Sequence, residues 1–287
     1  MLYSKSKQIL QKINVPKPFD TARYLFETQF VRNIFERMKP INAQTGGGIH
    51  KVTFNGIDVI LHSIKEDDVT LYNIYRKDNI NKQTCLVMII TENSPIAYID
   101  NISYYNDCVK GGLAKGGGTW LLNFAIAFLN TNKKKFAITK IQLRDNSFKF
   151  CRASKKSINL ALMSTLIKGD TWYCGHGFIP YDKDNDVTDK QLMKFRFANR
   201  SIMSKIKVNQ TKVEKYIRAI ARKLEIEIDG IDELLEHYNN MPLSSFLKQF
   251  MENYDETCII FGGFYLKLAN NIGLFDFRGH SFYLPLI

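Results

Sequence analysis

The sequence predicts an α+β fold, with a mixed, mainly antiparallel sheet and an additional, mostly helical C-terminal region. Three observations predict it. Short stretches of alternating apolar and polar residues, separated by turn residues, fill the segment before residue 106 and are typical of antiparallel strands. A glycine-rich loop and an apolar helix then lead to another alternating stretch, which is the order of a strand–helix–strand crossover. The last third of the chain has apolar residues at helical spacing.

The first segment, residues 1–45, is expected to be an N-terminal arm and a helix. Residues 1–18 are polar and basic and end in Val-Pro-Lys-Pro, which favours an extended arm. Asp20 can cap a helix that continues to about Met38, because apolar residues recur along one face before Pro40 ends the pattern.

The core is predicted over residues 46–186. Asn55-Gly56 stands between two alternating stretches and predicts a tight hairpin, because both residues tolerate a positive φ. Strands are then expected at residues 69–75, 85–91 and 96–105, followed by the loop 111–118 and a helix at 120–130. A strand at 136–143, a helix at 157–167 and a turn into a final strand at 173–180 complete the core.

The remaining segment, residues 187–287, is predicted to be a basic helical segment followed by an acidic helical region. Lys and Arg outnumber Asp and Glu over residues 187–223, and the balance reverses from Leu224 to the end. The basic part favours nucleic acid or an acidic protein as a partner, or else forms a solvated face. The aromatic stretches 257–265 and 280–287 are expected to return as strands and to be buried in an interface, for example with a second copy of the chain.

The composition excludes several classes of protein. A hydrophobic content of 45% is that of a packed globular protein rather than a disordered one. No apolar run reaches the roughly 18–20 residues of a membrane span, and the N-terminus lacks the pattern of a secretory signal, so no membrane partner is expected. The five scattered cysteines form no Cys-x-x-Cys pair. They predict free thiols in a reducing, intracellular compartment, the cytoplasm or a virion, and no metal site.

The loop at residues 115–119, Lys-Gly-Gly-Gly-Thr, is the segment best suited to chemistry. Three consecutive glycines before an apolar helix let several backbone N–H groups converge on one anion, and the helix dipole adds to the attraction. Lys110 and Lys115 could supply counter-charge. The same glycines are also compatible with a flexible turn. The loop is not a Walker A motif, because no Lys-Ser/Thr follows its last glycine.

Three stretches resemble the GNAT family of N-acetyltransferases. One is Ile141-Gln142-Leu143, which resembles the strand before the family's Asn-x-x-Ala segment. Residues 113–122 read Leu-Ala-Lys-Gly-Gly-Gly-Thr-Trp-Leu-Leu and match, without a gap, the family's pyrophosphate loop Arg-Gly-Lys-Gly-Ile-Gly-Ser-Ala-Leu-Leu. Residues 172–180 read Trp-Tyr-Cys-Gly-His-Gly-Phe-Ile-Pro and resemble the family's Phe-Tyr-Glu-Lys-x-Gly-Phe turn. Leu113 and Ala114 replace the leading arginine and the first glycine of the family loop. Residues 143–147, Leu-Arg-Asp-Asn-Ser, with Cys151 and the stretch Gly-Asp-Thr-Trp-Tyr at 169–173, also resemble acetyltransferase-like proteins of large DNA viruses.

The resemblance implies a GNAT-like core that transfers an acetyl group from acetyl-CoA directly to an amine. The amine must lose a proton before it attacks, and Asp100 or Asp145 is the candidate base. Tyr173 matches the family tyrosine that protonates the thiolate leaving group. The CoA pyrophosphate is assigned to Lys115, Gly116, Gly117, Gly118 and Thr119.

Each assigned residue also has a purely structural interpretation. Tyr173 can be a core aromatic beside Trp172 and Phe178, Asp100 can face solvent, and Asp145 can cap the following segment. For the whole chain, the alternative is a catalytically degenerate protein that keeps the fold and binds nucleic acid or packs in an assembly such as a virion. Three observations favour this alternative: the missing leading arginine, Ser147 at the position of the family's asparagine, and the absence of a clear base.

Overall fold

The computed structural model describes residues 48–76, 83–109, 112–113, 116–223, 236, 238–252 and 254–286. These residues form two compact units. The sheet unit comprises the described residues up to Arg144 together with 281–286, and the helical unit runs from Asp145 to His280. The chain therefore passes between units after Arg144 and after His280, whereas the sequence places the core over residues 46–186. The expected N-terminal arm and helix, residues 1–45, lie outside the described residues.

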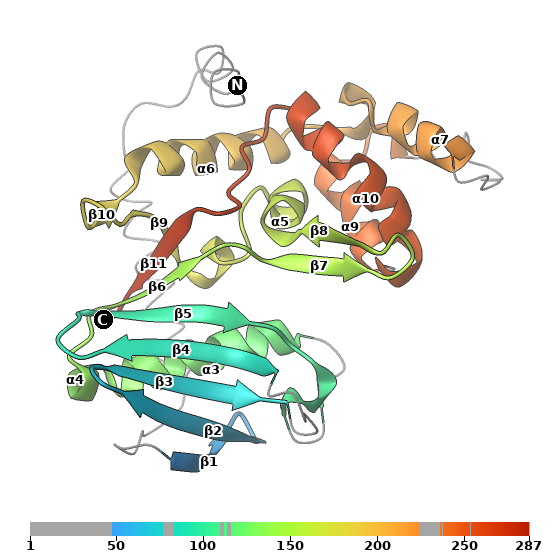
Figure 1. Cartoon of the computed structure of the whole chain (residues 1–287). Coiled ribbons are helices and arrows are strands. Elements are labelled where there is room, and N and C mark those ends of the chain that lie inside the picture. Colours follow the sequence, from blue (N-terminus) through green and yellow to red (C-terminus); the bar gives the residue numbers. More distant parts are fainter. Residues whose placement is uncertain are drawn as a thin grey trace. The chain divides into compact units, whose positions relative to one another are not determined.

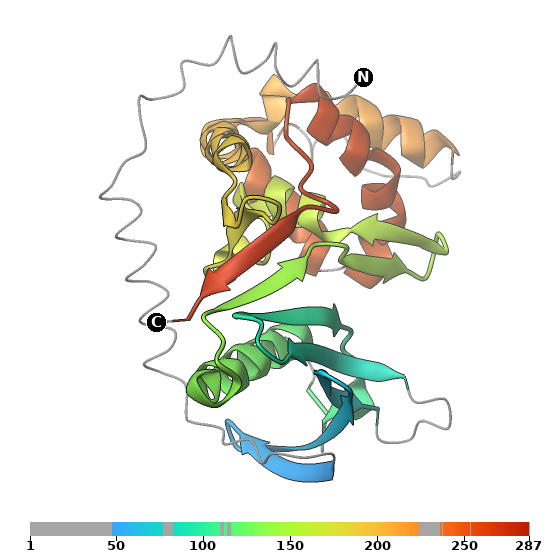
Figure 2. The same cartoon turned by 60° about the vertical axis from the view of Figure 1, so that its left-hand side comes forward.

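The sheet unit is built on a mixed, mostly antiparallel sheet (Figures 1 and 2), which confirms the predicted fold class. Its strands follow the order β1-β2-β3-β4-β5-β6-β11, and within this series β5 and β6 are the parallel pair. The last residues of the chain supply β11, which pairs with β6 antiparallel. The strands are β1 (Gly48–Phe54), β2 (Ile57–Glu66), β3 (Val69–Tyr75), β4 (Thr84–Thr91), β5 (Ile96–Ile102), β6 (Lys140–Arg144) and β11 (Ser281–Pro285).

The predicted hairpin at Asn55-Gly56 is confirmed. Both residues have a positive φ, of 49° and 76°, and they join β1 to β2. A two-residue turn of this kind matches the twist of the flanking strands, which fixes the register of the first two strands.

Helix α3 (Gly117–Thr131) crosses from β5 to β6 and covers one face of the sheet. Its apolar residues are buried against the strands, with Phe124 edge-on to Phe54 and Phe128 beside Tyr72. The short helix α4 (Lys133–Phe136) follows and ends at Ala137, which has a φ of 53°. The predicted strand at 136–143 therefore begins later than expected, at Lys140.

The helical unit contains a two-stranded ribbon, a short hairpin and several helices. The predicted mostly helical C-terminal region is confirmed, but residues 257–265 lie in α10 and not in a strand. Cys258, Phe261 and Tyr265 are buried at helical spacing in that helix. The elements are β7 (Phe148–Cys151), β8 (Lys156–Asn159), α5 (Leu160–Lys168), β9 (Ile179–Asp182), β10 (Val187–Thr188), α6 (Lys190–Met203), α7 (Val213–Lys223), α9 (Leu243–Glu252) and α10 (Tyr254–Asn271).

The expectation of free thiols is wrong for all but Cys174. Cys85 is bonded to Cys108 and Cys151 to Cys258, whereas Cys174 is a buried free thiol. The bonded partners lie 23 and 107 residues apart in sequence, so no local spacing pattern of cysteines predicts these two disulfides.

Among the helices of the described part of the chain, none is long and apolar enough to cross a membrane.

Candidate functional site

The candidate site lies where β5 leads into α3, and its first feature is a bulge in β5. Val87 on β4 pairs with Asn101, and the next residue, Met88, pairs with Ile99. Asp100 is thus an extra residue without a partner on β4, which is a β-bulge. Its side chain is exposed, whereas Ile99 is buried, so the bulge presents the carboxylate to solvent.

The second feature is the end of the parallel pairing. The register of β5 with β6 runs from Ile96 opposite Lys140 to Ile99 opposite Leu143. β5 continues to Ile102, and Figures 1 and 2 show β6 leaving the line of β5 towards its carboxyl end. From residue 100 to the end of β5, the backbone N–H and C=O groups on the β6 side therefore make no ladder hydrogen bonds to β6.

The third feature is the start of α3. Gly116 is the N-terminal cap, with a left-handed backbone at φ 79° and an exposed position. The N–H of Trp120 bonds the carbonyl oxygen of Gly116 at 2.9 Å and begins the helical ladder. Helix geometry leaves the N–H groups of Gly117, Gly118 and Thr119 without an intrahelical acceptor. With the positive end of the helix dipole, these groups form an anion-binding surface.

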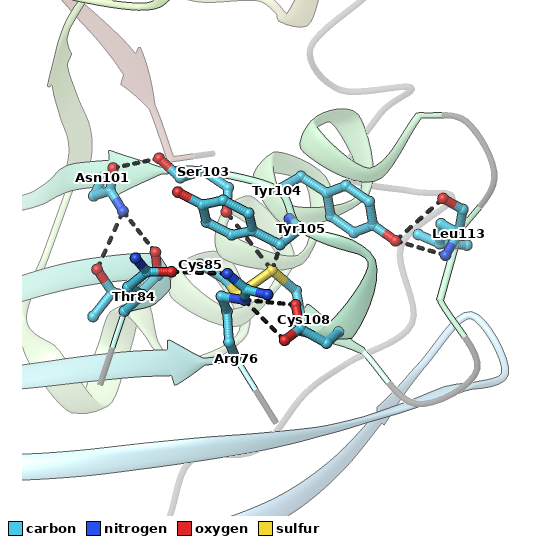
Figure 3. Close-up of a disulfide and its surroundings, with 11 residues drawn as sticks. Arg76, Thr84, Cys85, Asn101, Ser103, Tyr104, Tyr105, Cys108 and Leu113 are labelled. Atoms are coloured by element: carbon cyan, nitrogen blue, oxygen red, sulfur yellow. Dashed lines mark hydrogen bonds and ion pairs between the residues drawn. A yellow bond between two sulfur atoms is a disulfide. The ribbon is translucent and has the colours of Figure 1, made fainter. Parts of the chain in front are cut away.

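Tyr104 holds this loop in place (Figure 3). Its hydroxyl donates to the carbonyl oxygen of Leu113 at 3.3 Å and accepts from the N–H of Leu113 at 2.6 Å. Its ring lies directly on Gly117, where an added Cβ would come within 2.2 Å of the ring carbon Cγ. Gly117 must therefore be glycine because Tyr104 occupies the space of a side chain.

A disulfide and an ion pair fix the segment between β5 and the loop (Figure 3). Cys108 is bonded to Cys85 on β4. Nε of Arg76 donates to both carboxylate oxygens of Asp107, each at 2.8 Å, and the guanidinium lies 4.6 Å from the ring centroid of Tyr105. These contacts tie the segment to the ends of β3 and β4, so the loop begins from a rigid base.

Tyr98 lies next to the bulge, and the charges of Asp100 and Arg144 affect the pKa of its phenol. Burial raises the pKa of the Tyr98 phenol above its ordinary value, the charge of Asp100 raises it further, and Arg144 lowers it. The phenol is therefore protonated near neutral pH. The sheet unit thus places a proton donor, Tyr98, near an exposed carboxylate, Asp100, and sequence patterns gave no signal for Tyr98.

Tyr173 belongs to the helical unit, whereas Asp100 and the glycine loop belong to the sheet unit. Its side chain is buried, with the ring 4.9 Å from Trp172 and 5.9 Å from Phe178 between centroids. Burial lowers the pKa of the neighbouring His176 to about 4, with a smaller effect of Lys168. Burial also raises the pKa of the Cys174 thiol, so both groups are uncharged near neutral pH.

Asp145 also belongs to the helical unit and is fully buried. Its Oδ1 accepts from the N–H and the hydroxyl of Ser147, while its Oδ2 has no hydrogen-bond partner among the described residues. Burial raises its pKa to about 6, against the lowering effect of the Ser147 bonds, and the charge of Asp276 adds to the rise.

The structure thus brings Gly116, Gly117, Gly118 and Thr119 together with Asp100 in one unit, at the carboxyl end of β5. Lys110 and Lys115 lie outside the described residues. Sequence patterns missed Tyr104, Arg76 and the disulfide; each acts by a contact with a residue that no local spacing links to it. No group of three or more His, Cys, Asp or Glu side chains that could hold a metal ion occurs in the part of the chain that the structure describes.

Comparisons of the chain with protein-family models, with curated proteins and with solved structures give no match.

Proposed function

We propose that the chain is an acetyl-CoA-dependent N-acetyltransferase with a GNAT-like core. The observation that carries the proposal is the set of three consecutive glycines at the start of α3, the helix that follows the bulged strand β5. Support also comes from the parallel β6 that follows α3, because an antiparallel series with one such crossover is the order that the family resemblance implies.

In this proposal the N–H groups of Gly117, Gly118 and Thr119 bind the CoA pyrophosphate. The pantetheine arm contains amide groups, which can hydrogen-bond to the edge of β5 beyond Ile99 in the manner of an added strand. The thioester then lies near the bulge at Asp100.

The amine nitrogen attacks the thioester carbonyl carbon, a C–N bond forms and the C–S bond breaks. Asp100 accepts the proton that the amine loses, since its carboxylate is exposed to an incoming substrate. The thiolate of CoA leaves and takes a proton from a tyrosine. Tyr173 is the donor by family resemblance, and Tyr98 is the donor that shares a unit with the glycine loop.

Calorimetric titration with acetyl-CoA and desulfo-CoA tests the binding step. We expect wild-type protein to bind both, and Gly118→Glu and Thr119→Glu to abolish binding by placing a negative charge at the pyrophosphate. Thr119→Glu is compatible with helix formation, because an acidic residue is favourable in a first turn. Gly175→Glu is the matched control, since Gly175 is exposed with open space around its Cβ position. Absence of binding by the wild type would refute the proposal.

Two variants separate the candidate donors. Tyr98→Phe and Tyr173→Phe each remove one hydroxyl, and the variant of the true donor should lower turnover about 100-fold while CoA affinity stays unchanged. Loss of turnover in Tyr98→Phe alone would place the acid in the sheet unit. Unchanged turnover in both would overturn both assignments.

A second candidate function is binding of nucleic acid through residues 187–223 by a catalytically degenerate protein. In α7 the apolar Val213 and Ile217 are buried, while Lys215 and Arg222 are exposed on the opposite side of the helix. A basic helical stripe can neutralise phosphates, so affinity should fall steeply with salt. This function would be favoured by such binding without any affinity for acetyl-CoA.

A further inference from the structure

The ribbon formed by β7 and β8 exposes two large aromatic side chains. Phe148 is 64% exposed and Phe150 is 53% exposed. The two residues are separated by one position on a strand, so they lie on the same face, about 6.7 Å apart. Ser157, opposite Phe150 on β8, is exposed beside them. Two neighbouring phenylalanines with this exposure form an aromatic surface that the helical unit does not bury.

The opposite face of the ribbon is fastened to α10. Cys151 is bonded to Cys258, and Ile158 is buried. The hydroxyl of Tyr254 donates to the carbonyl oxygen of Lys149 at 3.3 Å, and the Lys149 ammonium lies 3.7 Å from the Tyr254 ring centroid. Figures 1 and 2 show the ribbon alongside α10. The exposed face is therefore a rigid surface on a supported strand pair.

The turn of the ribbon is also basic. Arg152 and Lys155 are exposed in the turn, while Lys156 pairs with Cys151 and therefore lies on the face opposite the two phenylalanines. Residues 146–159 contain no Asp or Glu in the sequence. A ligand that fits this surface must offer flat apolar groups and negative charge together.

We propose that the β7–β8 ribbon binds single-stranded nucleic acid, with bases on Phe148 and Phe150 and phosphates on Arg152 and Lys155. Aromatic side chains on alternate strand positions let successive unpaired bases stack on a sheet surface, and cations beside them follow the backbone. A second copy of the same basic ribbon would meet like charge, so charge complementarity favours a polyanion. The surface lies outside the proposed acetyl-CoA site, and its ligand does not depend on acetyl transfer.

Fluorescence anisotropy with labelled 12-nucleotide oligo(U) and oligo(dT), and with a duplex of equal length, tests the proposal. The double variant Phe148→Ala/Phe150→Ala should bind the single strands at least about tenfold more weakly, the effect of losing base stacking. Phe148→Trp/Phe150→Trp should retain binding, because its rings still stack. Ile49→Ala/Ile60→Ala is the matched control, since these side chains are 70% and 51% exposed on the sheet unit. Comparison of oligo(U) with oligo(dT) shows whether RNA or DNA is preferred.

Charge variants provide a second readout. Arg152→Gln/Lys155→Gln should reduce the slope of log affinity against log salt by about 0.7 for each phosphate that the protein no longer neutralises. The alanine double variant should leave that slope unchanged. The proposal is overturned if wild type binds no single strand, or if the alanine variant binds as wild type does. It is also overturned if binding depends on Lys215 and Arg222 instead, or if the phenylalanines prove to mediate self-association in sedimentation experiments.

Discussion

Within each unit, stabilising contacts join residues at different separations along the sequence. Around the glycine loop of the sheet unit, Tyr104 bonds Leu113, and the disulfide joins Cys85 to Cys108 across a separation of 23 residues. In the helical unit Cys151 is bonded to Cys258 across 107 residues, and Asn159 donates to Asp276 across 117. A covalent tie across a longer stretch removes more freedom from the unfolded chain. We therefore expect the helical unit to depend more strongly on a few specific ties.

The two tryptophans allow this comparison to be measured. Trp120 lies in the sheet unit and Trp172 in the helical unit, and the chain has no other tryptophan. Trp120→Phe leaves a fluorescent reporter in the helical unit, and Trp172→Phe leaves one in the sheet unit. Urea unfolding of each background then follows one unit at a time.

The largest effect is expected at Asp170. Nε of Arg196 donates to its carboxylate at 3.0 Å, and Arg200 donates to the same group, while the Arg196 side chain is only 2% exposed. Asp170→Ala would leave a buried guanidinium without its carboxylate, at a cost of about 3–5 kcal/mol in the free energy of unfolding. Urea unfolding in the Trp120→Phe background, followed by Trp172 fluorescence, measures this loss of stability. Arg278→Ala is the control, because Arg278 pairs with Asp276 at 3.9 Å on the surface and should change stability by less than about 0.5 kcal/mol.

The disulfides come next. Cys151→Ala/Cys258→Ala should destabilise the helical unit by about 2–4 kcal/mol, because the bond closes a loop of 107 residues. Cys85→Ala/Cys108→Ala should destabilise the sheet unit by less, since its loop spans 23 residues. The Trp172 and Trp120 signals report the two effects. Peptide mapping of unreduced protein by mass spectrometry must show both cross-links, and free thiols at these four positions would contradict the comparison.

Asp145 should make the helical unit sensitive to pH. Burial raises its pKa from 3.8 to about 6, so between these values the folded state holds a proton that the unfolded state has lost. Stability then falls as pH rises from about 4 to about 6 and is constant above, with a total of about 2–3 kcal/mol.

Asp145→Asn removes this titration. The stability of wild type minus that of Asp145→Asn should fall by about 2 kcal/mol between pH 4.5 and pH 7, measured by urea unfolding with the Trp172 reporter. Comparing this stability difference at the two pH values removes any pH-independent effect of the asparagine substitution. Asp184→Asn, in an exposed turn, is the control. An equal difference at both pH values would show that Asp145 titrates normally.

Much of the sheet unit could be predicted because its signals are local. Asn55-Gly56 predicts the hairpin between β1 and β2, and the glycines before Trp120 indicate the start of α3. The predictions that failed concern features that depend on contacts between residues far apart in the sequence. Residues 257–265 are aromatic enough for a strand, yet they continue a helix whose buried face is set by packing with distant elements. The disulfides and the Asp170–Arg196 pair depend on contacts that only the folded chain brings about.

The candidate site divides in the same way. The glycine loop and Asp100 could be found from the sequence, because a loop motif and a strand position are local properties. Tyr104 could not, because its contact with Gly117 crosses the loop. The burial of Asp145 could not be foreseen either, because alternation patterns do not show which segments the helical unit folds over, whereas the aromatic neighbours of Tyr173 already allowed for its burial.

The smallest effects are expected within the glycine loop, where two neighbouring glycines are required for different reasons. Gly116 has a φ of 79° with open space around its Cβ position, so Gly116→Ala should cost about 1 kcal/mol for the left-handed backbone. Gly117 meets the Tyr104 ring, so Gly117→Ala should cost about 1–2 kcal/mol by overpacking. Trp120 fluorescence during urea unfolding measures both.

A double-mutant cycle separates the two causes. Tyr104→Ala removes the ring that fills the side-chain space at Gly117, so Gly117→Ala should cost little in that background, while the cost of Gly116→Ala should be unchanged. Equal costs of Gly117→Ala with and without Tyr104 would mean that the ring does not hold the loop. A cycle with the expected coupling would show that a contact within one unit, between residues only 13 positions apart, sets the shape of the anion-binding surface. That outcome would sharpen the contrast with the long-range ties of the helical unit.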